Sequence, residues 1–169
     1  MSNQRYLDVI ITIDGFQHGK EEFVLKAMAI VSCFHHTQWT RTYDTNFLLN
    51  RPRTHLVTYH KQSAHHGHPL LKSGAAQFSA PKHFFSALCA VQCHWLEEKQ
   101  MPVPALSLWT KGVQNCRFLE VWLPWTTQIY NLEDIDCPPL KTFALPSDVV
   151  ESKTLAKALA LASWFQARP

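Results

Sequence analysis

Four histidines lie within nine residues of the sequence, in the segment HKQSAHHGHP that begins at residue 60. Neutral imidazoles at such short spacing can bind zinc, nickel or copper. The segment contains no cysteine or carboxylate to complete a four-ligand site, so we expect only weak Zn²⁺ binding, by His65, His66 and His68. The alternative is an exposed loop whose imidazoles bond to phosphate or water and gain charge below about pH 6.5.

These histidines belong to a segment with an excess of positive charge. Residues 41–83 contain six Lys or Arg, six His and a single acid, Asp44, which gives a net charge of +5, whereas the whole chain carries +3. Such an asymmetry favours an anionic partner. A solvated basic loop without a partner is the alternative. We expect the partner to be single-stranded nucleic acid, RNA or DNA, bound through Arg41, Arg51, Arg53, Lys61 and Lys72.

Aromatic residues flank these basic positions, namely Trp39, Tyr43 and Tyr59. Aromatic side chains stack on unpaired bases, and each stacked base contributes about 1–3 kcal/mol to binding. Packing in the core or against a sheet is the alternative for each of the three. The aromatic pattern therefore adds a little support to the prediction of a single-stranded ligand.

Three strands are expected in the first quarter of the chain, and they would position the candidate functional residues. Residues 6–17 form a nearly continuous apolar run, which is typical of a strand covered on both faces. Residues 23–33 are again apolar, and residues 36–43 alternate in a composition that favours strands. The three segments predict an antiparallel meander. Residues 55–60 are either a further edge strand or part of the connection to the first helix.

Helices and strands alternate in the rest of the chain. Helix start signals are present at Ser79 and Pro81, and again at Ser147 and Asp148. A meander followed by strand–helix–strand crossovers predicts an α/β fold with a mixed five-stranded sheet and helices on both faces. The expected elements are helices at 81–99, 113–123 and from 148 onward, and strands at 105–112 and 128–133.

Length and composition predict one globular domain over residues 1–169. At this size a chain buries roughly 70% of its unfolded surface, and 46% hydrophobic with 17% charged residues is an ordinary composition. No apolar run approaches the roughly 20 residues that span a bilayer. The polar N-terminus lacks a secretory pattern, so we expect an intracellular protein, nuclear or cytoplasmic. Five scattered cysteines without close pairs predict buried free thiols.

The sequence contains five short motifs, namely ITIDGF at 11–16, FVLKAMAIV at 23–31, HHGHPLLKSG at 65–74, LWTKG at 108–112 and IDCPPL at 135–140. Together they resemble exonuclease-like members of the ribonuclease H-like superfamily with the Asp-Glu-Asp-Asp type of site, and also the related Maelstrom-type domains. The resemblance implies a three-layer ribonuclease H-like fold and a 3'–5' exonuclease that holds two divalent ions, Mg²⁺ or Mn²⁺, between carboxylates. In that mechanism one ion activates a water molecule and both stabilise charge on the phosphate.

Compared with the pattern that the resemblance implies, the site is degenerate. The first strand should carry acid, any residue, acid, but the triplet begins with Thr12 and keeps only Asp14. Lys111 follows the fourth strand, where relatives usually have an aspartate. Residues 149–169 contain no His, although the last helix of many relatives carries a His and Asp pair. The zinc ligands of Maelstrom-type domains are not matched either, because Ala27 replaces a Glu and Cys137 is alone.

Four acids remain as catalytic candidates. Asp14 comes first, because Asp8, Thr12 and Asp14 share one face of a strand with a period of two. Glu133, with its neighbours Asp134 and Asp136, follows the last strand, and Asp148 begins the last helix. The structural alternatives are a strand-end aspartate before a turn glycine and a solvated acidic loop.

We therefore predict a nucleic-acid-binding domain whose nuclease site is degenerate and inactive or impaired. The first alternative is an active metal-dependent exonuclease in which Asp8 or Glu133 compensates for Thr12. The second is a protein-interaction adaptor on the same fold, which would expose an apolar patch. The first residues to inspect for that patch are Trp122, Pro124 and Trp125.

Overall fold

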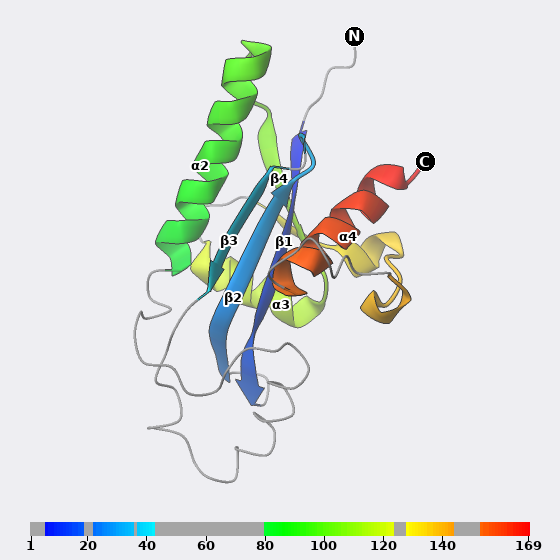
Figure 1. Cartoon of the computed structure of the whole chain (residues 1–169). Helices are drawn as coiled ribbons and strands as arrows, with labels where there is room; N and C mark the ends of the chain where they lie inside the picture. The colour runs from blue at the N-terminus through cyan, green and yellow to red at the C-terminus, as the bar shows by residue number, and fades with distance from the viewer. Residues whose placement is uncertain (1–5, 19–21, 36, 43–79, 124–127, 144–152) are drawn as a thin grey trace.

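The computed structural model describes residues 6–18, 22–35, 37–42, 80–123, 128–143 and 153–169. These residues form an α/β structure with helices packed against one mixed sheet (Figure 1). The elements in chain order are β1 (Tyr6–His18), β2 (Glu22–Ser32), β3 (Gln38–Thr42), α2 (Ala80–Lys99), β4 (Ala105–Thr110), α3 (Val113–Trp122), β5 (Ile129–Asn131), the 3₁₀ turns η4 (Leu132–Ile135) and η5 (Leu140–Thr142), and α4 (Lys153–Ala167).

The five strands form one sheet in the order β3-β2-β1-β4-β5. The pairs β1–β2 and β2–β3 are antiparallel, whereas β1–β4 and β4–β5 are parallel. The predicted meander and the predicted five-stranded mixed sheet are thus confirmed. β1 is the central strand and runs past the end of β4, since Ile10 pairs with Trp109 and β4 stops one residue later. The register between β1 and β2 shifts between Asp14 and Gly15.

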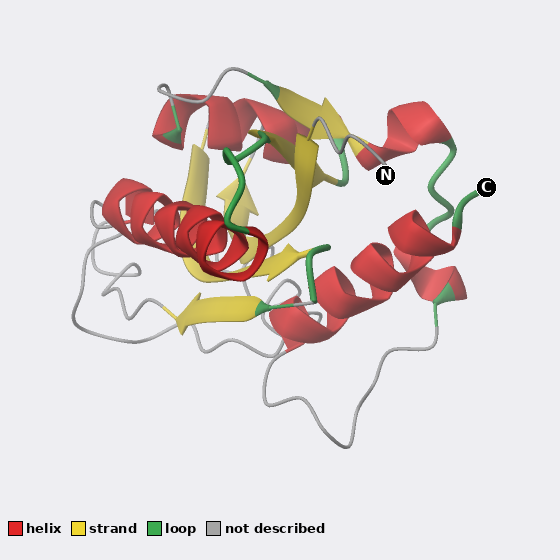
Figure 2. Cartoon of the chain, turned by 90° about the horizontal axis from the view of Figure 1, so that it is seen from above, coloured by secondary structure: helices red, strands yellow, loops and turns green. Residues whose placement is uncertain are grey.

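Successive side chains along β1 point alternately to the two faces of the sheet, as the period of a strand requires. Leu7, Val9, Ile11 and Ile13 are buried in a core formed with α2 and α3. Ile10 is buried in a second core, formed with α4. The sheet therefore lies between α2 and α3 on one face and α4 on the other (Figures 1 and 2). This arrangement directs Thr12 and Asp14, which are even-numbered like Ile10, toward α4.

The end of β5 differs from the sequence prediction. The strand was expected at 128–133 but stops at Asn131, because the Asn131 side chain turns the chain into η4. Its Oδ1 accepts hydrogen bonds from the backbone N–H groups of Glu133 and Gly112, both at 3.0 Å. One amide side chain thus caps η4 and also holds the start of α3.

β4 is also shorter than predicted, ending at Thr110 rather than 112. Gly112 has a φ of 105°, a conformation that favours glycine, and α3 begins directly after it. The helix expected from 148 is described from Lys153 onward, and the predicted caps Ser147 and Asp148 lie outside the described residues, as does segment 55–60. None of the helices in the described ranges is long and apolar enough to cross a membrane.

Candidate functional site

Asp14, the first catalytic candidate, is held by two side chains of α4. The ammonium group of Lys157 donates to Asp14 Oδ1 at 2.6 Å, and the hydroxyl of Thr154 donates to Oδ2 at 2.5 Å. Thr154 and Lys157 are three residues apart, so they lie on the same side of the helix. The Asp14 and Lys157 side chains are only 11% and 14% exposed. Asp14 is therefore a largely buried, ion-paired carboxylate.

Thr12, which replaces the first acid of the expected pattern, also contacts α4. Its hydroxyl donates to the backbone carbonyl oxygen of Thr154 at 2.7 Å. Thr12 is 7% exposed and Thr154 is fully buried. The hydroxyl thus joins the central strand to the first turn of α4 at the position where the resemblance implies an acid.

The pairing of Asp14 and Lys157 determines what this position can do chemically. A divalent cation binds carboxylates because it supplies opposite charge, and here an ammonium group already supplies that charge at contact distance. Displacing Lys157 would leave a mostly buried cation without its partner, which is costly. The arrangement therefore favours a structural role for Asp14 over metal binding.

Asp8 lies on the same face of β1 but far from Asp14. Six residues separate them, and at about 3.3 Å per residue the distance along the strand is roughly 20 Å. Asp8 Oδ1 accepts a hydrogen bond from Trp109 Nε1 at 3.0 Å. Burial raises the pKa of Asp8, while the Trp109 hydrogen bond and the positive charge of Arg168 partly oppose this rise. Asp8 and Asp14 therefore cannot share one ion.

We expect the Asp8→Asn variant to be more stable than the parent at neutral pH. Because folding raises the pKa of this carboxyl above 3.8, the folded state binds more protons, and stability falls as pH rises from that value through the folded pKa. The amide of the variant cannot ionise and keeps an oxygen that can accept from Trp109. The advantage of the variant should grow from pH 3 to pH 7 in urea unfolding experiments. A constant difference across this range would contradict the assignment.

Glu133, the third candidate, forms an exposed ion pair. Its Oε1 lies 3.3 Å from the ammonium of Lys111, and the Glu133 and Lys111 side chains are 49% and 14% exposed, respectively. Lys111 directly follows β4, where the resemblance implies an acid. Asp134 and Asp136 are exposed as well. This end of β4 and β5 thus combines a mostly buried cation with solvated acids.

The described residues bring no metal site together. In the described ranges no three His, Cys, Asp or Glu side chains lie close enough to hold an ion. All five cysteines are free thiols, as predicted, but only Cys116 and Cys137 are buried, and Cys93 is exposed. Burial raises the pKa of Cys33 to about 12 and that of Cys116 to about 11, so both thiols stay protonated at neutral pH.

Several predicted binding residues lie outside the described part of the chain. Arg41 is in β3, where it pairs with Met28 of β2. Pro124 and Trp125, two residues of the predicted apolar patch, lie outside the described ranges. The other predicted residues outside these ranges are Arg51, Arg53, Lys61, Lys72, His65, His66, His68 and Asp148.

The sequence reasoning missed the two α4 residues that bind Asp14. Lys157 lies between Ala156 and Ala158, both buried, on a helix that presents apolar residues to the sheet. A single cation at the border of an apolar helix face is a signal that could have been noticed. Its partner could not have been chosen from the sequence, because 143 residues separate Lys157 from Asp14.

The described residues thus define an α/β protein with a five-stranded mixed sheet, whose central strand carries a carboxylate neutralised by a lysine of the last helix. Comparison with protein-family models found no matching family, and a search of curated proteins found no match.

Proposed function

We propose that the chain is a ribonuclease H-like domain that binds single-stranded nucleic acid, RNA or DNA, and has lost much or all of an ancestral nuclease site. The fold part of the proposal is supported by the element order, in which an antiparallel meander precedes two strands that are added in parallel. It is also supported by the helices on both faces of the sheet. This order is the one that the resemblance of the sequence motifs implies.

The loss of the nuclease site is supported above all by the ion pair between Asp14 and Lys157. Metal-assisted phosphoryl transfer needs several carboxylates around two divalent ions. Here the carboxylate of the central strand binds an ammonium group at 2.6 Å, and the neighbouring acid position holds Thr12. Mg²⁺ or Mn²⁺ would be a cofactor only if activity remained, and any Zn²⁺ would bind weakly at His65, His66 and His68.

The binding part of the proposal is supported by charge. Residues 41–83 carry a net charge of +5 in a chain of +3, and Asp44 is the only acid among them. Phosphate contacts supply most of the affinity in sequence-independent binding. Loss of catalysis does not remove these contacts, so binding can persist in a domain that no longer cleaves.

The experiment is a fluorescence-anisotropy titration of a labelled 20-mer at several salt concentrations. Each phosphate contact on a single strand gives a slope of about −0.7 in log affinity against log salt, so four contacts give roughly −3. The Arg51→Ala, Arg53→Ala double variant should bind more weakly to every sequence, with a slope shallower by about one unit. Lys141→Ala, on the exposed turn η5, is the matched control and should leave the slope unchanged.

Two outcomes would contradict this proposal. Undetectable affinity at low salt, or equal affinity of the parent and the double variant, would mean that the basic segment is only a solvated loop. Cleavage of the 20-mer with Mn²⁺, abolished by Asp14→Asn, would instead establish the active exonuclease. The geometry does not favour that alternative, because neither Asp8 nor Glu133 is grouped with Asp14 in a metal-binding cluster of the described residues.

An adaptor function is the second candidate, and one observation favours it. On α2, Phe85 and Leu96 are 52% and 50% exposed, and Cys93 between them is also exposed. Phe85 and Leu96 are eleven residues apart, which places them on the same side of the helix about 16 Å from each other. Exposed apolar side chains on one side of a helix can contact a protein partner. This exposed face of α2 is therefore where a partner would bind if the chain failed to bind nucleic acid.

A further inference from the structure

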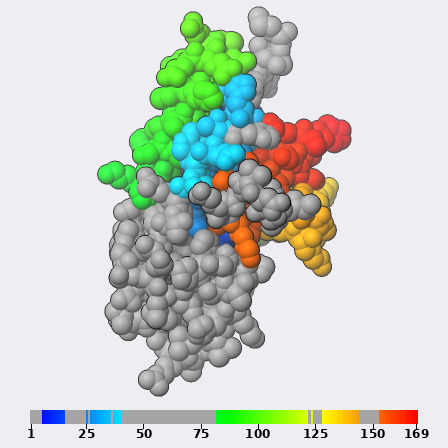
Figure 3. Space-filling model, viewed as in Figure 1, coloured from blue at the N-terminus to red at the C-terminus, as the bar shows by residue number. Residues whose placement is uncertain are grey.

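A pocket lies between α2 and the outer strands of the sheet. Figure 3 shows β3 and α2 side by side at the surface, and the pocket is formed where these two elements meet β2. Its volume is about 320 Å³. Ligand pockets usually measure about 300–1,000 Å³, so this one has room for a single small ring system. It is lined by Met28, Trp39, Thr40, His83, Ser86 and Ala87.

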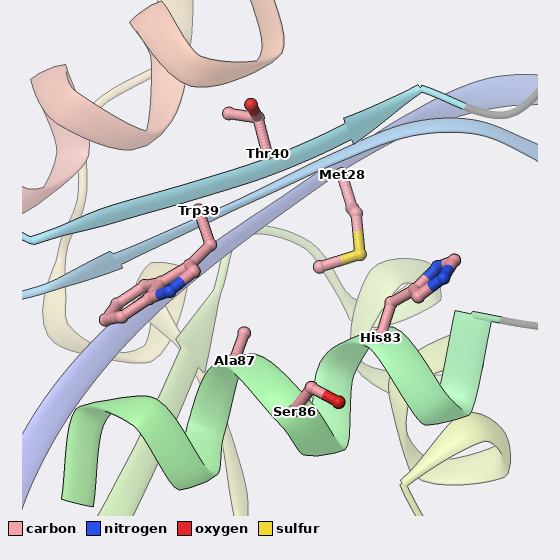
Figure 4. A pocket seen from close by; sticks show the side chains of 6 residues that line it. All are labelled: Met28, Trp39, Thr40, His83, Ser86 and Ala87. Carbon is pink, nitrogen blue, oxygen red and sulfur yellow. The ribbon is translucent and has the colours of Figure 1, made fainter. Parts of the chain in front are cut away.

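The walls of the pocket are apolar and suit a flat ring. Met28 and Trp39 point from the strands toward α2, and Ala87 points from α2 toward the strands (Figure 4). Met28 is 1% exposed and Ala87 is 6% exposed, so both form the floor, while Trp39 is half-buried and borders the opening. Indole rings stack on aromatic ligands, and thioether sulfur atoms make favourable contacts with them.

Polar groups lie at one side of the pocket. His83 and Ser86 are three residues apart on α2, so they lie on neighbouring turns of the same side of the helix. An imidazole and a hydroxyl can each donate or accept a hydrogen bond at the edge of a ring. No carboxylate is among the described lining residues. Lys82 is exposed beside His83, so the surroundings favour a ligand that carries negative charge.

We propose that this pocket receives one unpaired base of a single-stranded nucleic acid, stacked against Trp39 and hydrogen-bonded at its edge by His83 or Ser86. The inference rests on the proposed function and adds to it a subsite for a base. A phosphate beside the base would lie near Lys82 of α2. A pocket for a single ring explains why the partner would be single-stranded, because a paired base cannot leave its duplex without unstacking.

The experiment compares a 20-mer of uridine with an abasic 20-mer, which has the same number of phosphates. The parent should bind the uridine 20-mer about tenfold more tightly, the range expected for one stacked base. Trp39→Ala should remove this preference, and Trp39→Phe should keep most of it. Trp164→Ala, on the far helix α4, is the matched control and should leave the preference unchanged.

A second variant is needed because Trp39 also packs against the core, so that Trp39→Ala could lose binding through misfolding. Ser86→Leu changes an exposed position and fills the pocket without removing core atoms. It should abolish the preference for the uridine 20-mer while binding of the abasic 20-mer stays the same.

The same titrations distinguish failure of the base pocket from failure of the proposed function. Tight, equal binding of both 20-mers would overturn the base pocket and leave the proposed function standing, whereas binding of neither would overturn both. Displacement of the uridine 20-mer by micromolar uridine monophosphate would assign the pocket to free nucleotides instead.

Discussion

Replacing Lys157 with methionine is expected to lower the free energy of unfolding by about 3 kcal/mol. The substitution removes the ammonium group that lies 2.6 Å from Asp14 and leaves a carboxylate that is 11% exposed. Removing one partner of a buried ion pair costs about 3–5 kcal/mol, and the remaining exposure of this pair places it at the lower end. For a chain of this size the melting temperature should fall by roughly 6–12 °C.

The assignment of that loss to the ion pair needs two controls. Lys141→Met removes an equivalent ammonium group from an exposed position on η5 and should change stability by less than about 0.5 kcal/mol. Asp14→Asn combined with Lys157→Met removes both charges and should recover part of the loss, since neither charge of the pair remains. If Lys157→Met alone cost under about 1 kcal/mol, solvent would be screening the pair, and Asp14 would remain open to a cation.

The Thr12→Glu, Lys157→Glu double variant is expected to gain Mn²⁺-dependent stability that the parent lacks. Thr12, Asp14 and Lys157 are neighbours around Thr154. Thr12 donates to the Thr154 carbonyl, Asp14 accepts from the Thr154 hydroxyl, and Lys157 pairs with Asp14. Three carboxylates there repel each other, so the variant without metal should melt well below the parent. A divalent cation bound only to the folded state at 100 times its dissociation constant adds about 2.7 kcal/mol, which corresponds to roughly 5–10 °C.

The control for this gain in Mn²⁺-dependent stability is a variant with the same added negative charge at other positions. Gln100→Glu combined with Lys141→Glu adds the same charge at two exposed positions, after α2 and on η5, and its melting temperature should not respond to Mn²⁺. A double variant at Thr12 and Lys157 that folds but ignores Mn²⁺ would show that these positions never formed a metal-binding geometry. The proposal of a degenerate nuclease site would then lose its geometric support.

The order of strands and helices could be predicted because each element has a local signal. The apolar run of β1 and the apolar residues of α2 at helical spacing are visible within 20 residues of sequence. The end of β5 could not be predicted in the same way. It depends on the Asn131 side chain, which binds the backbone of Gly112, 19 residues earlier in the chain.

The candidate site shows the same division between local and distant information. Asp14 and Thr12 could be placed on one face of a strand from their spacing, and the structure has them both facing α4. The charge state of that site depends on Lys157, whose partner is set by how α4 crosses the sheet. No pattern in the sequence near Asp14 carries that information, so a free carboxylate and a paired one could not be told apart.

The ion pair between Asp14 and Lys157 also determines how related sequences should be interpreted. A substitution of either residue alone leaves the other charge beneath α4 without its ion-pair partner, so the two residues are expected to change together during evolution. An aspartate at this strand position would then be retained for folding even in lineages without catalysis, and its presence would be no sign of nuclease activity. The residue that faces it from the last helix is the informative one, because a lysine there pairs with the aspartate, whereas an acid there would add a second carboxylate that a divalent cation could bridge.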